Sequence, residues 1–413
     1  MTASTTDSWR ELGQVAGPRG STVLPRSFST RPTMCEAFRQ RHARWRAQHR
    51  IIFFCGLSSG FGGFLNSITA GFAASLLTER ALIISCPKTH EAESITREVG
   101  HYFHGVPGVD WSPTGLPLKE LYSQAVLVRV PASGYGPHGV LNQTHSHMSA
   151  DAYFGDRALF LFANEHTALD KLLSINRIGS RRHMKALEST MDTTGYDFAT
   201  IARCALQTLF VPSQELLAAA REVLGQSTDV QSGPPYGGLE QPYTALHVRL
   251  GDGSMAQPKL DGGNWKWARE ERPVPIIDRA HPEVALRCFQ RTFSPPHVVI
   301  TDTLAVAKAA EELGMITTSR FGRAFHMGMR SSTCRLATAS HSGGMMKHSN
   351  NKSVHEPGCE AGTIKLFLDW LLLAMANESR IAGQSALSAS ARYWHARTTG
   401  TDYRHNSFTC GDS

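Results

Sequence analysis

A histidine, an arginine and an aspartate lie close together in residues 243–252, which have the sequence YTALHVRLGD. His247 and Arg249 are two residues apart, so in an extended strand their side chains point to the same face. Asp252 follows in a Leu-Gly-Asp-Gly turn just past the strand. A guanidinium donates two parallel hydrogen bonds and therefore fits a phosphate or a diphosphate. The residue types predict an anion-binding strand end, and the alternative is an edge strand with a surface arginine and a turn aspartate.

Strands that alternate with helices are predicted in both halves of the chain, which indicates an α/β protein. In the first half, the apolar runs at residues 51–56 (IIFFCG) and 81–86 (ALIISC) flank a helical stretch and predict a βαβ unit with a right-handed crossover. In the second half, strands are predicted within residues 243–252 and at 297–302 and 380–383, with helical patterns between them. The pattern therefore predicts two Rossmann-like domains that face a cleft.

Polar side chains follow the last two of these strands. Asp302 ends the run HVVITD, at the carboxyl end of its strand. Beyond the last strand, a strand-to-helix turn carries three hydroxyl groups, those of Ser385, Ser388 and Ser390. These hydroxyl groups could bind phosphate oxygens together with the N–H groups of a helix N-terminus, or they could only cap the helix.

The turn after the first strand is rich in glycine, at Gly60, Gly62 and Gly63, and a helix is predicted to follow from Ile68 to Leu77. Glycine lets the backbone approach a ligand closely, and a helix N-terminus is a ready anion site. The spacing fits neither a dinucleotide fingerprint nor a Walker loop. Taken alone, the turn favours the alternative of tight packing between strand and helix.

Composition bounds the class of protein. The chain has 413 residues, enough for about two domains, with 41% hydrophobic and 19% charged residues as in globular proteins. The net charge of +7 points weakly to an anionic partner. Residues 1–50 are rich in arginine and poor in acids, which predicts a disordered basic tail and leaves a transit peptide as the alternative.

Neither a metal site nor a membrane span is predicted. The eight cysteines contain no CxxC pair, which argues against a zinc ribbon. Cys55 and Cys86 lie in apolar runs and are interpreted as buried thiols, while one or two disulfides stay open for a lumenal protein. His138, His145 and His147 lie in a polar loop, where an HxH pair could bind a metal, but no ligand-rich partner segment lies nearby, which favours a solvated loop. No apolar run reaches about 18 residues, and no secretory signal is visible.

Taken together, these segments resemble the fucosyltransferase superfamily of two-domain glycosyltransferases, which have the GT-B architecture. The resemblance rests on four segments that occur in the family's order. Residues 59–84 are similar to the family's glycine turn and long helix, and His247-Val-Arg249-Leu-Gly-Asp252 fits its HxRxxD motif. Val299-Ile-Thr301-Asp302 is similar to a family strand that ends in Thr/Ser-Asp, and residues 369–391 are similar to an apolar helix, a short strand and a Ser-Ser turn. The resemblance covers residues 51–84 and 243–395, and residues 87–240 show none.

The resemblance implies a donor site for a GDP-sugar and a catalytic role for two of its residues. Arg249 would grip the β-phosphate and stabilise the departing GDP, and Asp252 would fix Arg249 or lie close to the reacting sugar. His247 would help hold the diphosphate or the ribose, and Asp302 would accept hydrogen bonds from guanine or ribose. The other donor contacts would come from Ser385, Ser388, Gly60 and Gly62.

The resemblance also implies the reaction, an inverting transfer of fucose from GDP-fucose to a glycan or protein hydroxyl. No metal or other cofactor is expected, because a preorganised guanidinium can stabilise the charge that a metal ion would otherwise balance. Residues 51–235 would form the acceptor-side domain and residues 243–400 the nucleotide-sugar domain. The family implies the lumen of the Golgi or the endoplasmic reticulum, whereas the lack of a visible signal or anchor fits a cytoplasmic protein or an incomplete N-terminus.

Departures from the family's pattern keep other hypotheses open. Gly63 and Phe64 stand where the family usually has Asn and Arg or Gln, Thr303 stands where a second acid often follows Asp302, and Ala386 replaces one serine. No acceptor-activating base is assigned among the candidates Asp252, Asp261, Glu270 and Glu271. One alternative is a catalytically inactive member that binds a GDP-sugar or a glycan. A lesser alternative is a nucleic-acid-binding protein, suggested by the arginines of residues 1–50.

Overall fold

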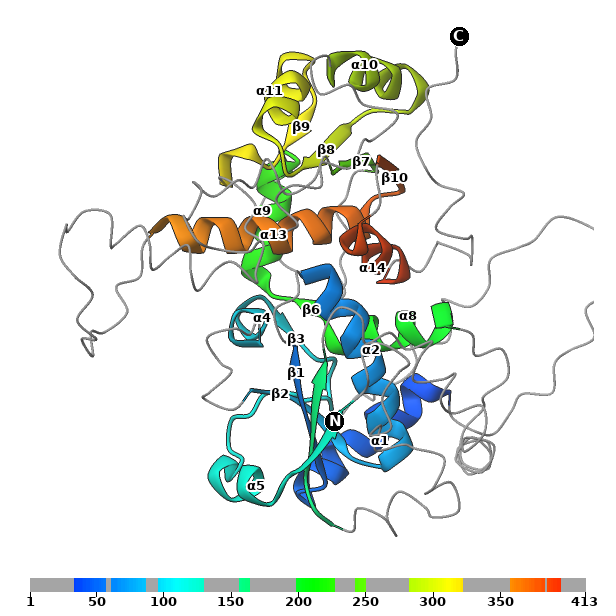
Figure 1. Ribbon diagram of the computed structural model, residues 1–413. Coiled ribbons are helices and arrows are strands. Elements are labelled where there is room, and N and C mark those ends of the chain that lie inside the picture. Colours follow the sequence, from blue (N-terminus) through cyan, green and yellow to red (C-terminus); the bar gives the residue numbers. More distant parts are fainter. Residues whose placement is uncertain are drawn as a thin grey trace, which may run out of the picture. The chain divides into compact units, whose positions relative to one another are not determined.

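A computed structural model describes residues 33–56, 61–86, 96–129, 156–163, 198–226, 242–249, 282–321, 357–382 and 385–394. Within these ranges the chain forms two four-stranded parallel sheets with helices around them (Figure 1). A short antiparallel pair joins β3 (Phe103–His104) to β6 (Val211–Pro212). The predicted α/β class with two parallel sheets is confirmed. The domain boundary predicted between residues 235 and 243 stays a prediction.

The first sheet has the strand order β2-β1-β5-β4. Its strands are β1 (Ile51–Gly56), β2 (Ala81–Ile84), β4 (Val126–Arg129) and β5 (Leu159–Ala163). Every residue of β1 and β2 is buried, as is typical of parallel strands covered on both faces, and this explains their continuous apolar sequences. Helix α2 (Phe61–Thr78) connects β1 to β2, so the predicted βαβ unit is confirmed.

The second sheet has the strand order β10-β7-β8-β9, and all of its strands are parallel. Its strands are β7 (Thr244–Val248), β8 (His297–Thr301), β9 (Ile316–Thr317) and β10 (Glu378–Ala382). The chain builds β8 and β9 on one side of β7 and then returns to add β10 on the other side. The direction of strand order therefore reverses at β7.

Helices cover both faces of the second sheet. Helices α10 (Pro282–Thr292) and α11 (Leu304–Glu312) share one apolar cluster with Leu246 and Val248 of β7. The alternate residue Ala245 belongs instead to the large cluster that contains α13 (Pro357–Met375). This alternation follows from the pleat of a strand, whose successive side chains point to opposite faces.

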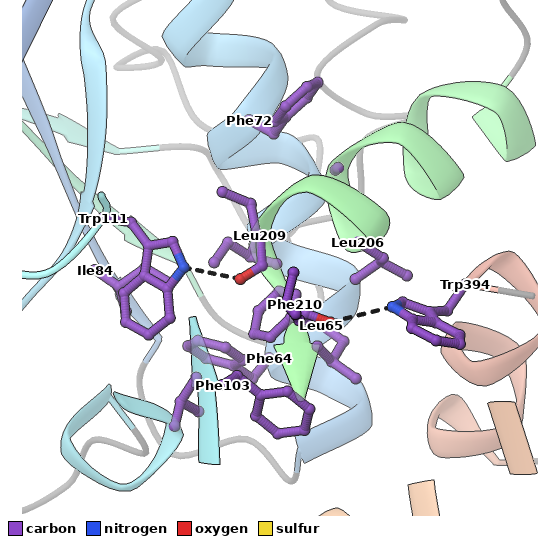
Figure 2. Close-up of a cluster of buried hydrophobic side chains, with 14 of the residues drawn as sticks. Phe64, Leu65, Phe72, Ile84, Phe103, Trp111, Leu206, Leu209, Phe210 and Trp394 are labelled. Carbon is purple, nitrogen blue, oxygen red and sulfur yellow. Dashed lines mark hydrogen bonds between the residues drawn. The ribbon is translucent and has the colours of Figure 1, made fainter. Parts of the chain in front are cut away.

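The C-terminal helices also complete the core of the first half of the chain. Helix α14 (Ala386–Trp394) packs against α2 and α8 (Phe198–Leu209), and α13 packs against α9 (Gln214–Val223). The indole Nε1 of Trp394 donates to the carbonyl oxygen of Phe210 at 3.2 Å, and that of Trp111 donates to Leu209 at 2.8 Å (Figure 2). One continuous apolar cluster therefore includes helices from both halves of the chain.

The structure corrects the predicted disordered tail at residues 33–49, where helix α1 (Met34–Ala47) is formed. Thr33 and Glu36 make a reciprocal capping box, with Thr33 N–H donating to Glu36 Oε2 at 2.8 Å. The helix has an apolar stripe at helical spacing, which the many arginines obscured in the sequence. The buried members of this stripe are Met34, Ala37, Phe38 and Trp45, and the polar His42 is buried on the same helix.

Disulfides join segments that are distant in sequence. Cys35 of α1 is bonded to Cys204 of α8, and Cys55 of β1 is bonded to Cys86, which lies just past β2. Cys288 is disulfide-bonded as well. The interpretation of Cys55 and Cys86 as buried thiols is therefore wrong, because the parallel pairing of β1 with β2 brings the ends of these strands together.

We predict that Gly56→Ala destabilises the protein by about 1–3 kcal/mol, the usual range for overpacking a core. An added Cβ would lie 3.0 Å from Cε2 of the Phe64 ring and still closer to Cδ2, and Phe64 is fully buried. Gly100→Ala is the matched control, because the nearest side-chain atom to its added Cβ is 3.9 Å away. We expect Gly100→Ala to be neutral or up to about 1 kcal/mol stabilising in a helix. Urea unfolding measures both values, and equal effects would contradict the prediction.

Candidate functional site

The carboxyl ends of β7, β8 and β10 meet at one edge of the second sheet. The strand register places Val248 of β7 beside Thr301 of β8 and Ala382 of β10. Because the strand order reverses at β7, this edge is the place where open α/β sheets bind ligands. The residues that follow each strand are therefore the candidate site.

His247 is buried in β7 and is hydrogen-bonded through Nδ1 to the hydroxyl group of Ser388 in α14. The structure thus brings together two of the predicted donor-binding residues, which lie 141 positions apart in sequence. Burial, and then the positive charges of Arg249 and Lys365, lower the pKa of His247 to about 3. The imidazole is therefore neutral at pH 7, and its Nδ1 contact holds the first turns of α14 against β7.

Arg249 follows β7 directly and is half-buried. Its backbone N–H donates to the carbonyl oxygen of Ala382 at 3.2 Å, which continues the pairing of β7 with β10 by one residue. Because this residue follows the end of β7 and is bonded to the end of β10, its backbone is held by the sheet. The predicted arginine therefore lies at the edge where the strand order reverses.

Asp302 follows β8 at the same edge and is half-buried. Its Oδ1 accepts a hydrogen bond from the hydroxyl group of Thr303 at 3.2 Å, and the N–H of Thr303 donates to Oγ1 of Thr301 at 3.1 Å. These contacts define a tight polar turn between β8 and α11. Thr303 occupies the N-cap position of α11, but its side chain makes no capping hydrogen bond there.

The three predicted hydroxyl groups of α14 have different partners. Ser385 lies just before the helix, and its Oγ accepts the N–H of Leu387 at 3.3 Å, as a capping residue does. Ser390 accepts a hydrogen bond from the indole of Trp370 at 3.2 Å. Because Ser388 is bonded to His247, each of the three serines has a different partner within the chain, and their contact with phosphate oxygens stays a prediction.

The N-terminus of α2 is packed with aromatic side chains. The helix begins at Phe61, earlier than the expected Ile68, so Gly62 lies in its first turn. The Phe61 ring lies 4.7 Å from Phe367 and 5.7 Å from Trp370, between ring centres. Phe64, where the family pattern has a polar side chain, is fully buried in the core. This part of the helix therefore serves packing, and a ligand contact of Gly62 stays a prediction.

A buried ion pair lies beside the site and was missed in the sequence. Lys365 Nζ of α13 lies 2.6 Å from Asp369 Oδ2 and donates to Thr318 Oγ1 at 2.8 Å and to the carbonyl oxygen of Thr301 at 3.5 Å. Burial raises the pKa of Asp369, while Lys365 and the Thr318 hydrogen bond oppose that shift. The available signal was a Lys and an Asp one turn apart within the otherwise apolar residues 364–375 of the helix.

Several predicted residues lie outside the described residues: Gly60, Asp252, the loop acids Asp261, Glu270 and Glu271, and the histidines His145 and His147. Among the residues that the structure does describe, no group of three or more His, Cys, Asp or Glu could hold a metal ion. In the same ranges, no helix is long and apolar enough to span a membrane.

No protein-family model and no curated protein matches the chain. Among solved structures, it is similar to an Arabidopsis thaliana FUT1 variant in complex with GDP, at 13% identity over 89% of this chain and 78% of that chain, with a TM-score of 0.47. It is also similar to NodZ alpha-1,6-fucosyltransferase soaked with GDP-fucose (13% identity, 84% and 93% covered, TM-score 0.36). A third is POFUT1 in complex with GDP-fucose (11% identity, 84% and 96% covered, TM-score 0.38). These likenesses concern the fold and place no residue of this chain in a site.

We predict that His247 makes stability fall as the pH falls below its ordinary pKa. Its pKa is about 3 in the folded chain against 6.5 ordinarily, so below pH 6.5 the unfolded chain binds a proton that the folded chain does not. Relative to His247→Asn, the wild type should lose about 3 kcal/mol between pH 6.5 and about pH 4, at about 1.4 kcal/mol per pH unit. His42, whose pKa is lowered to about 4, is present in both proteins and cancels. Urea unfolding at several pH values measures the difference, and a difference independent of pH would contradict the prediction.

Proposed function

We propose that this protein is a glycosyltransferase that binds GDP-fucose and transfers fucose, with inversion, to a hydroxyl group of a glycan or protein. The observation that supports the proposal is the half-buried Arg249 just past β7, at the reversal of strand order. Asp302 follows the neighbouring strand β8 at the same edge. A cation and a carboxylate so placed suit the diphosphate and the nucleoside of one ligand.

The chemistry of the reaction needs a cation at this place. When the acceptor oxygen attacks the anomeric carbon, its hydroxyl proton passes to a base or to water, and the electron pair of the broken sugar–phosphate bond stays on GDP. In the proposal, the guanidinium of Arg249 neutralises this charge with two parallel hydrogen bonds. Removing one preorganised donor of this kind costs about 10²–10³ in rate. Arg249 therefore takes the part of a metal ion, and the proposed reaction is metal-independent.

His247 and Ser388 have a different part in the proposal from the direct donor contact expected from the sequence. Both side chains are buried and bonded to each other, so they hold the start of α14 beside the end of β7. The N–H groups of the first turn of α14 would then lie near the diphosphate, where a helix N-terminus favours negative charge.

The oxidising compartment implied by the family is consistent with the cysteines. Cys35, Cys204, Cys55, Cys86 and Cys288 are all disulfide-bonded. Disulfides persist mainly in oxidising compartments, among them the lumen of the endoplasmic reticulum. The proposed place of action is therefore a lumen of the secretory pathway, where glycan and protein acceptors are present.

The structure favours one of the two alternative functions and weakens the other. A catalytically inactive chain that binds a GDP-sugar is favoured by Phe64, which fills the core where the family pattern has a polar side chain. The nucleic-acid hypothesis loses part of its basis, because α1 is a packed helix. Its Arg46 donates to the carbonyl oxygens of Asp110, Ser112 and Thr114.

We predict that GDP, and not UDP, stabilises the protein against heat, and that Arg249→Ala abolishes the effect. A ligand at about a hundred times its Kd adds about 2.7 kcal/mol to the free energy of unfolding. Arg287→Ala is the matched control, because Arg287 is exposed on α10. Melting curves with each nucleotide measure the effect, and equal shifts with GDP and UDP, or a full shift in Arg249→Ala, would overturn the proposed site.

Transfer activity separates the enzyme from the inactive alternative. Purified protein with GDP-fucose should release GDP, and Arg249→Ala should lower kcat by about 10²–10³. GDP binding without any turnover of GDP-fucose, with or without glycan acceptors, would favour the inactive binding protein. The same assay with and without a chelator tests the proposed independence from metal.

A further inference from the structure

The ion pair of Lys365 and Asp369 is buried within α13, one turn apart, with side chains only 5% and 4% exposed. Asp369 Oδ1 also accepts the hydroxyl group of Thr318 at 2.5 Å, and Thr318 in turn accepts a hydrogen bond from Lys365. The three side chains therefore form a closed polar cluster in a helix whose other described residues from 364 to 374 are apolar.

Stability alone does not explain this cluster. Removing two charges from water costs more than a buried ion pair usually returns, and well-packed apolar replacements are often neutral or stabilising. A cluster of this kind is better explained by the neighbouring segments whose positions it fixes. The charged head of Lys365 points out of α13 toward the polar ends of two strands, β8 and β9.

The cluster contacts the residue directly before Asp302. Lys365 Nζ lies 3.5 Å from the carbonyl oxygen of Thr301, the last residue of β8. Thr318 follows β9, which pairs with β8. The cluster thus joins α13 to the ends of both strands, directly before the half-buried carboxylate of Asp302.

We propose that Lys365, held by Asp369 and Thr318, is a positioning residue that fixes the turn after β8 and so makes Asp302 selective for guanine. The inference rests on the proposed function, because it concerns the nucleotide of the same site. Guanine has two adjacent N–H donors that one carboxylate can accept side by side, and uracil has a single ring N–H flanked by carbonyl oxygens. A carboxylate discriminates between these bases most strongly when its position is fixed, since a mobile group loses more conformational freedom when it accepts both donors of guanine.

The test replaces the whole cluster by apolar residues of similar size, in the variant Lys365→Met, Asp369→Leu, Thr318→Val. Replacing the three side chains together leaves none of them as a buried polar group without its partner, and only the long contact to the carbonyl oxygen of Thr301 is lost besides, so this variant should fold. The control removes an exposed ion pair with the same spacing, Lys308→Gln with Glu312→Gln on α11, whose side chains are 80% and 67% exposed. Calorimetry measures the Kd of GDP and of UDP for the wild type and each variant.

We expect the wild type to prefer GDP to UDP by at least about tenfold, as expected where a site pairs with polar groups that one ligand lacks. The triple variant should lose most of this preference through weaker GDP binding, with unchanged UDP binding and a melting temperature close to that of the wild type. Asp302→Asn should lose the same preference, and the α11 control should keep it. With GDP-fucose as donor, the triple variant should raise KM and leave kcat nearly unchanged.

Each other outcome overturns the inference in a recognisable way. An unchanged preference in the triple variant, or an equal loss of GDP and UDP binding, would show that the cluster has no part in selectivity. Should the triple variant fail to fold, Lys365→Gln is measured in its place, and a wild-type preference there would overturn the inference too. A wild type that prefers GDP while the triple variant keeps that preference overturns this inference alone, whereas a wild type that binds GDP and UDP equally well, or binds neither, overturns the proposed function as well.

Discussion

Four parallel strands in the order β10-β7-β8-β9 impose the constraint on which the candidate site depends. Since β7 is the first of these strands in sequence but lies inside the sheet, its neighbours come from segments far downstream on both sides. Hydrogen bonding in register then brings Val248, Thr301 and Ala382 side by side. Each of these residues is followed within a few positions by a polar group, so a single edge collects groups that the sequence keeps apart.

The helices that support this edge are held by the rest of the core. Helix α14 has Ser388 near its start, bonded to His247, and Trp394 at its end, bonded to the backbone of Phe210. Helix α13 likewise has Lys365 beside the strand ends and Trp370 among the aromatic rings around Phe61. Sites supported by packed helices and strands are held more precisely than sites on loops. The packing of α13 and α14 against the first half of the chain therefore helps to fix the positions of the site residues in the second half.

The ionisable side chains near this edge differ in their environments. Burial keeps His247 neutral, and Lys365 is balanced at close range by Asp369. Arg249 is only half-buried, at the end of its strand. An interaction between a partly buried cation and an anion is stronger than the same pair in bulk water, because the effective dielectric constant is lower. In the proposed function, the diphosphate would meet the guanidinium of Arg249 in this partly buried setting.

Local patterns predicted the strands well, because a buried parallel strand needs an uninterrupted apolar run, as in residues 51–56 and 297–301. Local patterns predicted helices less well where the residue composition concealed the helical spacing of apolar residues. The arginines of α1 concealed its buried stripe, and the glycines at residues 62 and 63 indicated a turn where the helix had already begun. Both errors arise from weighing single residue types above the spacing of apolar positions.

The sequence by itself determined the long buried strands, such as residues 51–56 and 297–301, the helices that directly follow them, and the polar residues His247, Arg249 and Asp302 beside the strand ends. These features are local, because a few neighbouring side chains decide them. Tertiary structure alone decided that His247 bonds to Ser388, that Cys55 pairs with Cys86, and that Lys365 reaches the end of β8. Such contacts depend on strand order, register and helix packing between distant segments, which no short stretch of sequence encodes.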